Sequence, residues 1–228
     1  MYFVDEVFEK DFYKEQGAKD PSQFSFGQIF TTPAYYPHEQ MQIWRPAPDP
    51  TEPTKTYAEE FVIMPKVGNA FKRDLPLGAP PLKANEEFLV IRAKIRPVVV
   101  IRPELPPLDI SKGSYKGAMQ RRRCLVAQVY GTRYTATNEL KYPPLFVERV
   151  RRMLYPHLMF LTEKRGPFEV ASILRLDELQ TVFTPHLTPT GYALSDYMAG
   201  VLQDQIRTYF TGDANNEYTM LRDELQGD

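Results

Sequence analysis

Residues 86–101 read EEFLVIRAKIRPVVVI, and residues 121–131 read RRRCLVAQVYG. Each segment contains a short run rich in β-branched and aliphatic side chains, residues 98–101 in the first and residues 124–129 in the second. Both runs are too short and too rich in β-branched residues to favour helices, so they predict buried strands. We expect the two strands to belong to one sheet, with the rest of the chain packed around them.

The composition is that of a folded protein with one large domain. The chain has 228 residues, of which 43% are hydrophobic and 13% aromatic, so it can build a sizeable core. Proline accounts for 21 residues, well above the usual share of about 5%, which favours short strands and ordered loops over long helices. The net charge of −1 gives no overall indication of a nucleic-acid or membrane partner, and such a partner would require a local charged patch.

Several classes of protein are not expected from this sequence. Cys124 is the single cysteine, so no disulfide can form within the chain, which suits a reducing cytoplasm. There is no apolar run of about 18 residues, and the acidic first 16 residues are unlike a signal peptide, so we expect a cytoplasmic protein without a membrane span. His157 and His186 lack metal-ligand spacing, and no phosphate-binding or serine-hydrolase motif occurs, so neither a metal nor a cofactor is expected.

Hydrophobic spacing predicts two helices, one at each end of the chain. Residues 1–16 carry apolar side chains at helical spacing and predict a short amphipathic helix. Residues 195–210 predict the clearest helix, with Ser195 and Asp196 suited to its N-terminus and Gly212 to its end. We expect at most one or two helical turns in residues 145–154 and a weak turn in the polar tail after residue 212.

The remaining segments predict short strands and loops. We expect strands in residues 26–32, 57–65, 158–161 and 167–174, and a short turn of helix or strand in residues 176–182. Residues 33–53 are rich in proline and predict a loop, either held by its own aromatic side chains or facing a partner. A proline-rich ligand for another domain is a further alternative for this loop.

This pattern of five to seven short strands and one late helix predicts an α+β protein that is mainly β. We expect a small, partly closed antiparallel barrel with helices attached, in a single domain. Its core would comprise residues 24–36 and 86–182, with an insertion at residues 37–85 and a C-terminal helix at residues 195–210.

Four segments, in order, resemble the MazF/PemK/Kid family of toxins from toxin–antitoxin pairs. They are FGQIF at residues 26–30, RPVVVI at residues 96–101, CLVAQVYGT at residues 124–132, and the closing strand, turn and helix from residue 170 to residue 210. The resemblance covers about half of the chain. It implies an SH3-like barrel with a C-terminal helix, a homodimer, and a metal-independent endoribonuclease that cuts single-stranded RNA and is blocked by an antitoxin.

The resemblance also implies catalytic residues. Arg96 matches the family's catalytic arginine, and the alternative is an arginine at a strand edge that pairs with a carboxylate such as Glu87. His38 lies in the loop where some relatives place a histidine acid or base, and the alternative is a solvated side chain. The family's Thr-Ser strand end is replaced here by Tyr130 and Gly131, so Thr132 is the expected hydroxyl and Tyr130 competes with it.

Two further departures separate this chain from the family pattern. It is about twice the usual length, and about sixty residues separate the first strand from the RP strand. The leading expectation is therefore an RNA-cleaving toxin. The alternative is a catalytically inactive barrel that binds protein or nucleic acid, and a third interpretation is an accessory protein of a phage or mobile element that uses the same barrel for assembly.

The expected substrate-binding residues form a local cationic group beside Tyr130. They are Arg121, Arg122, Arg123, Tyr130 and Arg133. Arginine and tyrosine side chains in this arrangement would bind phosphate and stack a base, whereas the alternative is a solvated, charged strand edge. We expect the arginines at positions 149, 151 and 152 to form the exposed face of a helix.

Overall fold

The computed structural model describes residues 2–8, 11–17, 23–36, 42–48, 51–52, 56–62, 83, 86, 88–103 and 122–227. The chain divides into two compact units. Met1–Ala34 and Ile95–Asp228 form the first unit, and Tyr35–Lys94 form the second. The expected insertion, residues 37–85, falls within the second unit.

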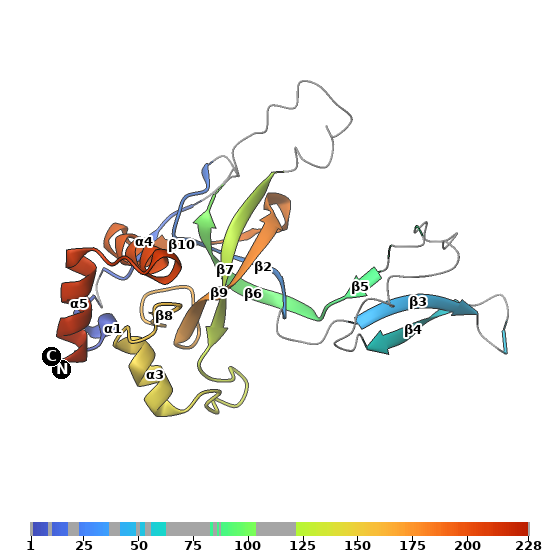
Figure 1. Ribbon diagram of the computed structural model, residues 1–228, viewed down its shortest axis with the longest axis horizontal. Coiled ribbons are helices and arrows are strands. Elements are labelled where there is room, and N and C mark those ends of the chain that lie inside the picture. Colours follow the sequence, from blue (N-terminus) through green and yellow to red (C-terminus); the bar gives the residue numbers. More distant parts are fainter. Residues whose placement is uncertain are drawn as a thin grey trace, which may run out of the picture. The chain divides into compact units, whose positions relative to one another are not determined.

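A seven-stranded sheet forms the centre of the first unit, in the order β1-β10-β2-β6-β7-β9-β8 (Figure 1). Its strands are β1 (Tyr13–Glu15), β2 (Gln28–Tyr35), β6 (Ala93–Arg102), β7 (Arg123–Gly131), β8 (Leu158–Leu161), β9 (Ser172–Phe183) and β10 (Thr188–Leu194). Strands β6 and β7 are antiparallel, with Val98 opposite Gln128 and Val100 opposite Val126. The prediction that the two aliphatic runs are strands of one sheet is therefore confirmed, and the structure shows that they pair directly.

The protein is a mixed α and β structure dominated by an antiparallel sheet, as expected, but the sheet is open. Strands β1 and β8 are its two edges within the described residues, and they do not pair to close a barrel. Strand β9 spans 12 residues, so the segment expected as a short turn of helix or strand at residues 176–182 is a strand, and it forms the middle and end of one long element. Strand β8 confirms the strand expected at residues 158–161.

Four helices accompany the sheet in the described part of the first unit. They are α1 (Val4–Val7), α3 (Pro144–Arg151), α4 (Asp196–Thr211) and α5 (Asn216–Gln226), and a 3₁₀ turn spans Thr184–His186. The predicted helix α4 is confirmed together with its ends. The Ser195 hydroxyl accepts a hydrogen bond of 3.1 Å from the Met198 amide, and Gly212 ends the helix with a left-handed φ of 77°.

Both ends of the chain differ from expectation. Among the described residues of the first 16, α1 is the helical part, because Tyr13 pairs with Leu194 in the sheet and its hydroxyl donates to the Thr162 carbonyl over 2.7 Å. In the tail, α5 runs for 11 residues, because Asn215 caps it and Tyr218, Leu221 and Leu225 bury an apolar stripe at helical spacing. Long-range packing decides the structure at both ends.

The apolar side chains of the first unit form two clusters on opposite faces of β6. Val99 belongs to the larger cluster, which also receives buried residues from all four helices. Val98 and Val100 belong to the smaller cluster, with Cys124 and Val182. Neighbouring residues of a strand point to opposite faces of the sheet, which explains this division. The polar residues of the candidate site lie next to the smaller cluster.

The second unit contains a three-stranded sheet in the order β4-β3-β5. Its strands are β3 (Gln42–Pro48), β4 (Thr56–Val62) and β5 (Phe88–Val90). The proline-rich segment expected as a loop therefore contains a strand, β3. Within the described residues, β5 pairs with residues 42–44 of β3. Beyond them, at Pro46 and Pro48, β4 is the one described neighbour of β3, so this part of β3 is an edge. Proline lacks an amide hydrogen and is tolerated at such edge positions.

Candidate functional site

Strands β6, β7 and β9 bring five polar residues together next to the smaller apolar cluster. We call Arg96, Gln128, Tyr130, Arg175 and Glu178 the Arg96 cluster. The guanidinium carbon of Arg96 lies 4.3 Å from the centre of the Tyr130 ring. The antiparallel register explains this contact, because Val98 lies opposite Gln128 and each strand then continues two residues to Arg96 and Tyr130.

The Tyr130 hydroxyl joins the arginines to a carboxylate. It donates a short hydrogen bond to Glu178 and lies 3.1 Å from the side-chain oxygen of Gln128. Glu178 also forms an ion pair of 2.7 Å with Arg175, whose guanidinium carbon lies 5.7 Å from the Tyr130 ring centre. The Tyr130 phenol is therefore hydrogen-bonded to the Glu178 carboxylate. It also lies close to the guanidinium groups of Arg96 and Arg175.

The Arg96 cluster is largely shielded from water. Arg96, Tyr130 and Glu178 are 7%, 9% and 6% exposed. Burial raises the pKa of Tyr130, and the hydrogen bond and negative charge of Glu178 raise it further, while Arg96 and Arg175 lower it by less. Tyr130 therefore keeps its proton at neutral pH and acts as a hydrogen-bond donor.

Three further hydrogen bonds surround the cluster. The Gln128 amide donates to Gln180 over 3.4 Å, and Gln180 donates to the Pro33 carbonyl on β2 over 3.3 Å. On the more exposed side, the Arg175 Nε donates to Asp177 over 3.1 Å. Burial acts to raise the pKa of Asp177, but the hydrogen bonds and charge of Arg175 outweigh it and the pKa is lowered.

Thr132 does not join the cluster, although the sequence suggested it as the reacting hydroxyl. Strand β7 ends at Gly131, and the Thr132 amide and hydroxyl then bond to the Ala171 carbonyl over 2.8 and 2.7 Å. These bonds fix Thr132 beside the segment before β9. The Tyr130 hydroxyl, the competing candidate, is the one that lies with Arg96.

The other predicted site residues are spread along β7 and its end. Arg122 is exposed, Arg123 is half-buried with its guanidinium carbon 5.7 Å from the Phe183 ring centre, and Arg133 is exposed after the strand. Arg123 and Tyr130 lie at opposite ends of β7, so the structure does not gather these residues into one site. Arg121, His38 and Glu87 lie outside the described residues.

The expectation for the arginines of α3 needs correction. Arg149 is exposed, but Arg151 bonds to both carboxylate oxygens of Asp5 over 2.7 and 2.8 Å. Arg152 pairs with Glu148 over 2.6 Å. Tertiary contacts with the N-terminal segment therefore partly bury a side chain that the helical pattern predicted to be solvated.

Sequence reasoning missed Glu178 and Arg175. The sequence predicted a strand at residues 167–174 and a separate short turn of helix or strand at residues 176–182, and not one long strand that carries both Arg175 and Glu178. The alternation of buried and partly exposed residues along β9 continues through this stretch and places Glu178 on the buried side. In the sequence, apolar residues alternate only as far as Leu176, and Glu178 and Gln180 then occupy the buried positions, so hydropathy alone did not reveal them.

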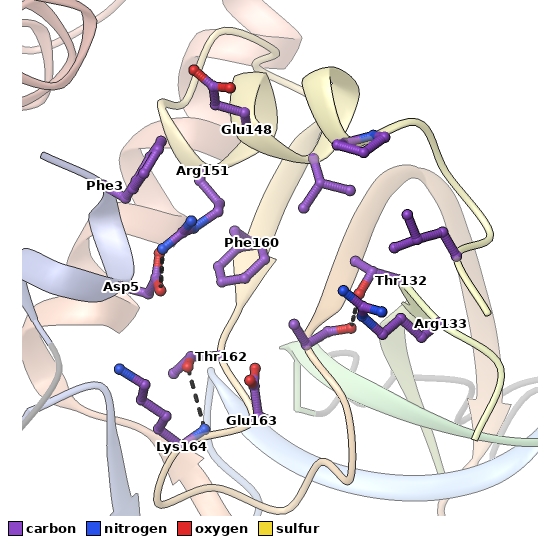
Figure 2. Close-up of a pocket in the computed structure, with 14 residues that line it drawn as sticks. Phe3, Asp5, Thr132, Arg133, Glu148, Arg151, Phe160, Thr162, Glu163 and Lys164 are labelled. Atoms are coloured by element: carbon purple, nitrogen blue, oxygen red, sulfur yellow. Dashed lines mark hydrogen bonds and ion pairs between the residues drawn. The ribbon is translucent and has the colours of Figure 1, made fainter. Parts of the chain in front are cut away.

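Thr132 and Arg133 instead line a cavity of about 460 Å³ in the first unit (Figure 2). Phe160 and Thr162 from the β8 region, Phe3 and Asp5 from the N-terminal segment, and residues of α3 complete its wall. The lining residues are Phe3, Asp5, Thr132, Arg133, Leu140, Pro144, Val147, Glu148, Arg151, Phe160, Thr162, Glu163, Lys164 and Ala171. The end of β7 therefore leads from the Arg96 cluster to a cavity.

No protein-family model matches the chain, and no curated protein sequence matches it. Among the described residues, no three His, Cys, Asp or Glu side chains are grouped in a way that would hold a metal ion. The helices in the described ranges include none with the length and hydropathy needed to cross a bilayer.

Proposed function

We propose that this protein is a metal-independent endoribonuclease of the MazF/PemK kind that cleaves single-stranded RNA at the Arg96 cluster. The observation that carries the proposal is the meeting of the Arg96 guanidinium, the Tyr130 hydroxyl and the Glu178 carboxylate. Metal-free RNA cleavage requires a base, a cation beside the phosphorane and a proton donor, and these three groups supply those functions.

The proposed reaction begins when Glu178 accepts the proton of the RNA 2′-hydroxyl. The 2′-oxygen then bonds to phosphorus, and Arg96 stabilises the negative charge on the phosphorane. The bond from phosphorus to the 5′-oxygen breaks, and that oxygen takes the proton of Tyr130. Glu178 returns its proton to Tyr130 through their hydrogen bond, which restores the cluster.

The placement of the matching segments supports this assignment. The segments that resemble the family lie on β2, β6, β7 and β9, which are consecutive in the sheet, and on α4. In this proposal the open sheet with α4 is a divergent form of the family's SH3-like barrel. The proposal also includes the family's partners, namely a second copy of the chain and an antitoxin protein.

Activity measurements on three variants test the proposal. Purified wild type, Arg96→Ala, Tyr130→Phe and Glu178→Gln would be incubated with a long single-stranded RNA in EDTA. We expect each variant to cleave about 100-fold more slowly or worse, because each loses one of the three chemical functions. Arg207→Ala, an exposed residue of α4, is the matched control and should cleave like the wild type.

The same series separates catalysis from folding. Thermal unfolding of each variant shows whether its fold is kept. Tyr130→Phe keeps the ring under Arg96 and removes one oxygen, so it is the mildest of the three changes. Cleavage by folded Tyr130→Phe at the wild-type rate would remove Tyr130 from the mechanism.

A second candidate function is a binding module without catalysis. The specific observation in its favour is that Arg96, Tyr130 and Glu178 are each less than one-tenth exposed, while the Thr132 hydroxyl is bonded to Ala171. In this case the Arg96 cluster stabilises the sheet. Folded wild type would bind RNA or a protein partner and leave the RNA intact, and Tyr130→Phe would change stability alone.

A further inference from the structure

The cavity beside the end of β7 has the size and chemistry of a nucleotide-binding site. We propose that it binds one guanine nucleotide of the RNA strand, next to the phosphate that reacts at the Arg96 cluster. This inference rests on the proposed function and names the part of the substrate that the enzyme selects. A volume of about 460 Å³ lies within the usual range of about 300–1,000 Å³ for ligand pockets.

Ion pairs at the cavity wall leave few charged side chains available to a ligand. Arg151 is held by Asp5, with its guanidinium carbon 3.8 Å from the Phe3 ring centre, and Glu148 is held by Arg152. These pairs neutralise much of the charge around the cavity. Arg133, Glu163 and Lys164 are the other charged side chains that line it.

Glu163 and Arg133 offer opposite charges to a ligand. No hydrogen bond or ion pair joins Glu163 to another residue in the described ranges, and Arg133 donates only to the Asn138 carbonyl, over 3.2 Å. Both side chains are exposed and border the cavity in Figure 2. A ligand that carries N–H donors at one end and an anion at the other satisfies both.

A guanine nucleotide has this distribution of groups. Its base presents two adjacent N–H donors, at N1 and the N2 amino group, which a carboxylate such as Glu163 accepts together. Its phosphate carries the negative charge that Arg133 binds. The apolar side chains of Leu140, Val147 and Phe160 line the same cavity and provide contact surface for the flat base.

The cavity and the reacting cluster share one short stretch of chain. Tyr130 belongs to the cluster, and Thr132 and Arg133 line the cavity. Three residues of extended chain span at most about 11 Å, so neighbouring nucleotides of one strand can occupy both places. In this proposal Arg133, the exposed arginine at the end of this stretch, therefore lies between the nucleotide whose base is selected and the phosphate whose bond is cleaved.

Calorimetric titration of the full-length protein tests the inference without relying on cleavage. The probes are guanosine, inosine and adenosine 5′-monophosphates, because inosine lacks only the N2 amino group. We expect guanosine monophosphate to bind about tenfold more tightly than inosine monophosphate, and Glu163→Gln to remove this preference. Arg133→Ala should weaken both, while the controls Glu169→Gln and Arg207→Ala, both exposed and outside the cavity, should bind like the wild type.

The outcomes separate this inference from the proposed function. Equal binding of the three nucleotides, no binding at millimolar concentration, or a preference that survives Glu163→Gln would overturn the guanine site even if RNA is cleaved. A Glu163-dependent preference in a protein that leaves RNA intact would support the nucleotide site and remove the ribonuclease assignment.

Discussion

Gly166 lies where any side chain would collide with the partly buried ring of Tyr13. A Cβ at this position would stand 2.3 Å from a Tyr13 ring carbon, and Tyr13 is fixed by its hydrogen bond to Thr162. We predict that Gly166→Ala destabilises the fold by about 1–3 kcal/mol, because the ring must move within a packed core. Urea unfolding measures the change.

The matched control for this prediction is Gly200→Ala in the middle of α4. A Cβ there meets nothing within 4 Å, so alanine should stabilise the helix by about 0.5–1 kcal/mol. Equal effects of the two substitutions would contradict the close approach of Tyr13 to Gly166.

Asp177 should make stability depend on pH. Its pKa is lowered in the folded protein, so the stabilisation from its contact with Arg175 is present above the unfolded value near 3.8 and is lost as the pH falls through the folded pKa. We predict that Asp177→Asn lowers the free energy of unfolding at pH 7, and that its difference from wild type shrinks below about pH 4. Urea unfolding across this range tests the prediction, with the exposed Asp213→Asn as a control. A difference that stays constant with pH would contradict it.

Among the residues of the Arg96 cluster, some could be identified from the sequence and others could not. Arg96 was identified from its position before Pro97 and a valine run, and Tyr130 from the end of the next run. Both identifications depended on local patterns. Glu178 is 48 residues from Tyr130 along the chain, so the hydrogen bond between them follows from the pairing of β7 with β9 and not from any local pattern.

Helix α4 and strand β8 are joined by one buried amide. Gln205 is fully buried, and its Nε2 donates to the carbonyls of Tyr155 and Leu158 over 3.2 and 2.6 Å. We predict that Gln205→Met destabilises the protein by about 1–3 kcal/mol, because the buried Leu158 carbonyl and the partly buried Tyr155 carbonyl lose their donor while the volume is nearly kept. Hydrogen exchange should also accelerate in β8.

Gln203→Met provides the comparison for this change. Gln203 lies on the exposed side of the same helix, so its substitution should leave both stability and exchange in β8 unchanged. Similar behaviour of the two variants would show that the Gln205 amide does not hold the strand.

Elements with strong local signals were predictable, and those built by distant contacts were not. The runs in β6 and β7 and the capped, amphipathic α4 were all visible in the sequence. The N-terminal segment carries helical spacing, but pairing of β1 with β10 overrides it after α1. Charged residues obscured β9, because a strand with one buried face tolerates charges that a wholly apolar run lacks.

The whole molecule consists of two units, and the Arg96 cluster and the cavity both belong to the first. The second unit begins and ends close together, because the Tyr36 amide donates to the Arg92 carbonyl over 2.9 Å. We predict that replacing residues 37–91 by a short glycine-rich turn keeps the first unit folded and keeps RNA cleavage, since this junction needs only a short closure. Circular dichroism and the cleavage assay test this, and unfolding of the shortened chain would contradict it.

The central claim is that the Arg96 cluster cleaves RNA by attack of the neighbouring 2′-hydroxyl. The most direct measurement is the chemistry of the RNA ends left by purified protein in EDTA. We predict 5′-hydroxyl and 2′,3′-cyclic phosphate ends with wild type and Arg207→Ala, and intact RNA with folded Arg96→Ala. Intact RNA with folded wild type, or ends carrying 5′-phosphate and 3′-hydroxyl groups, would contradict the claim.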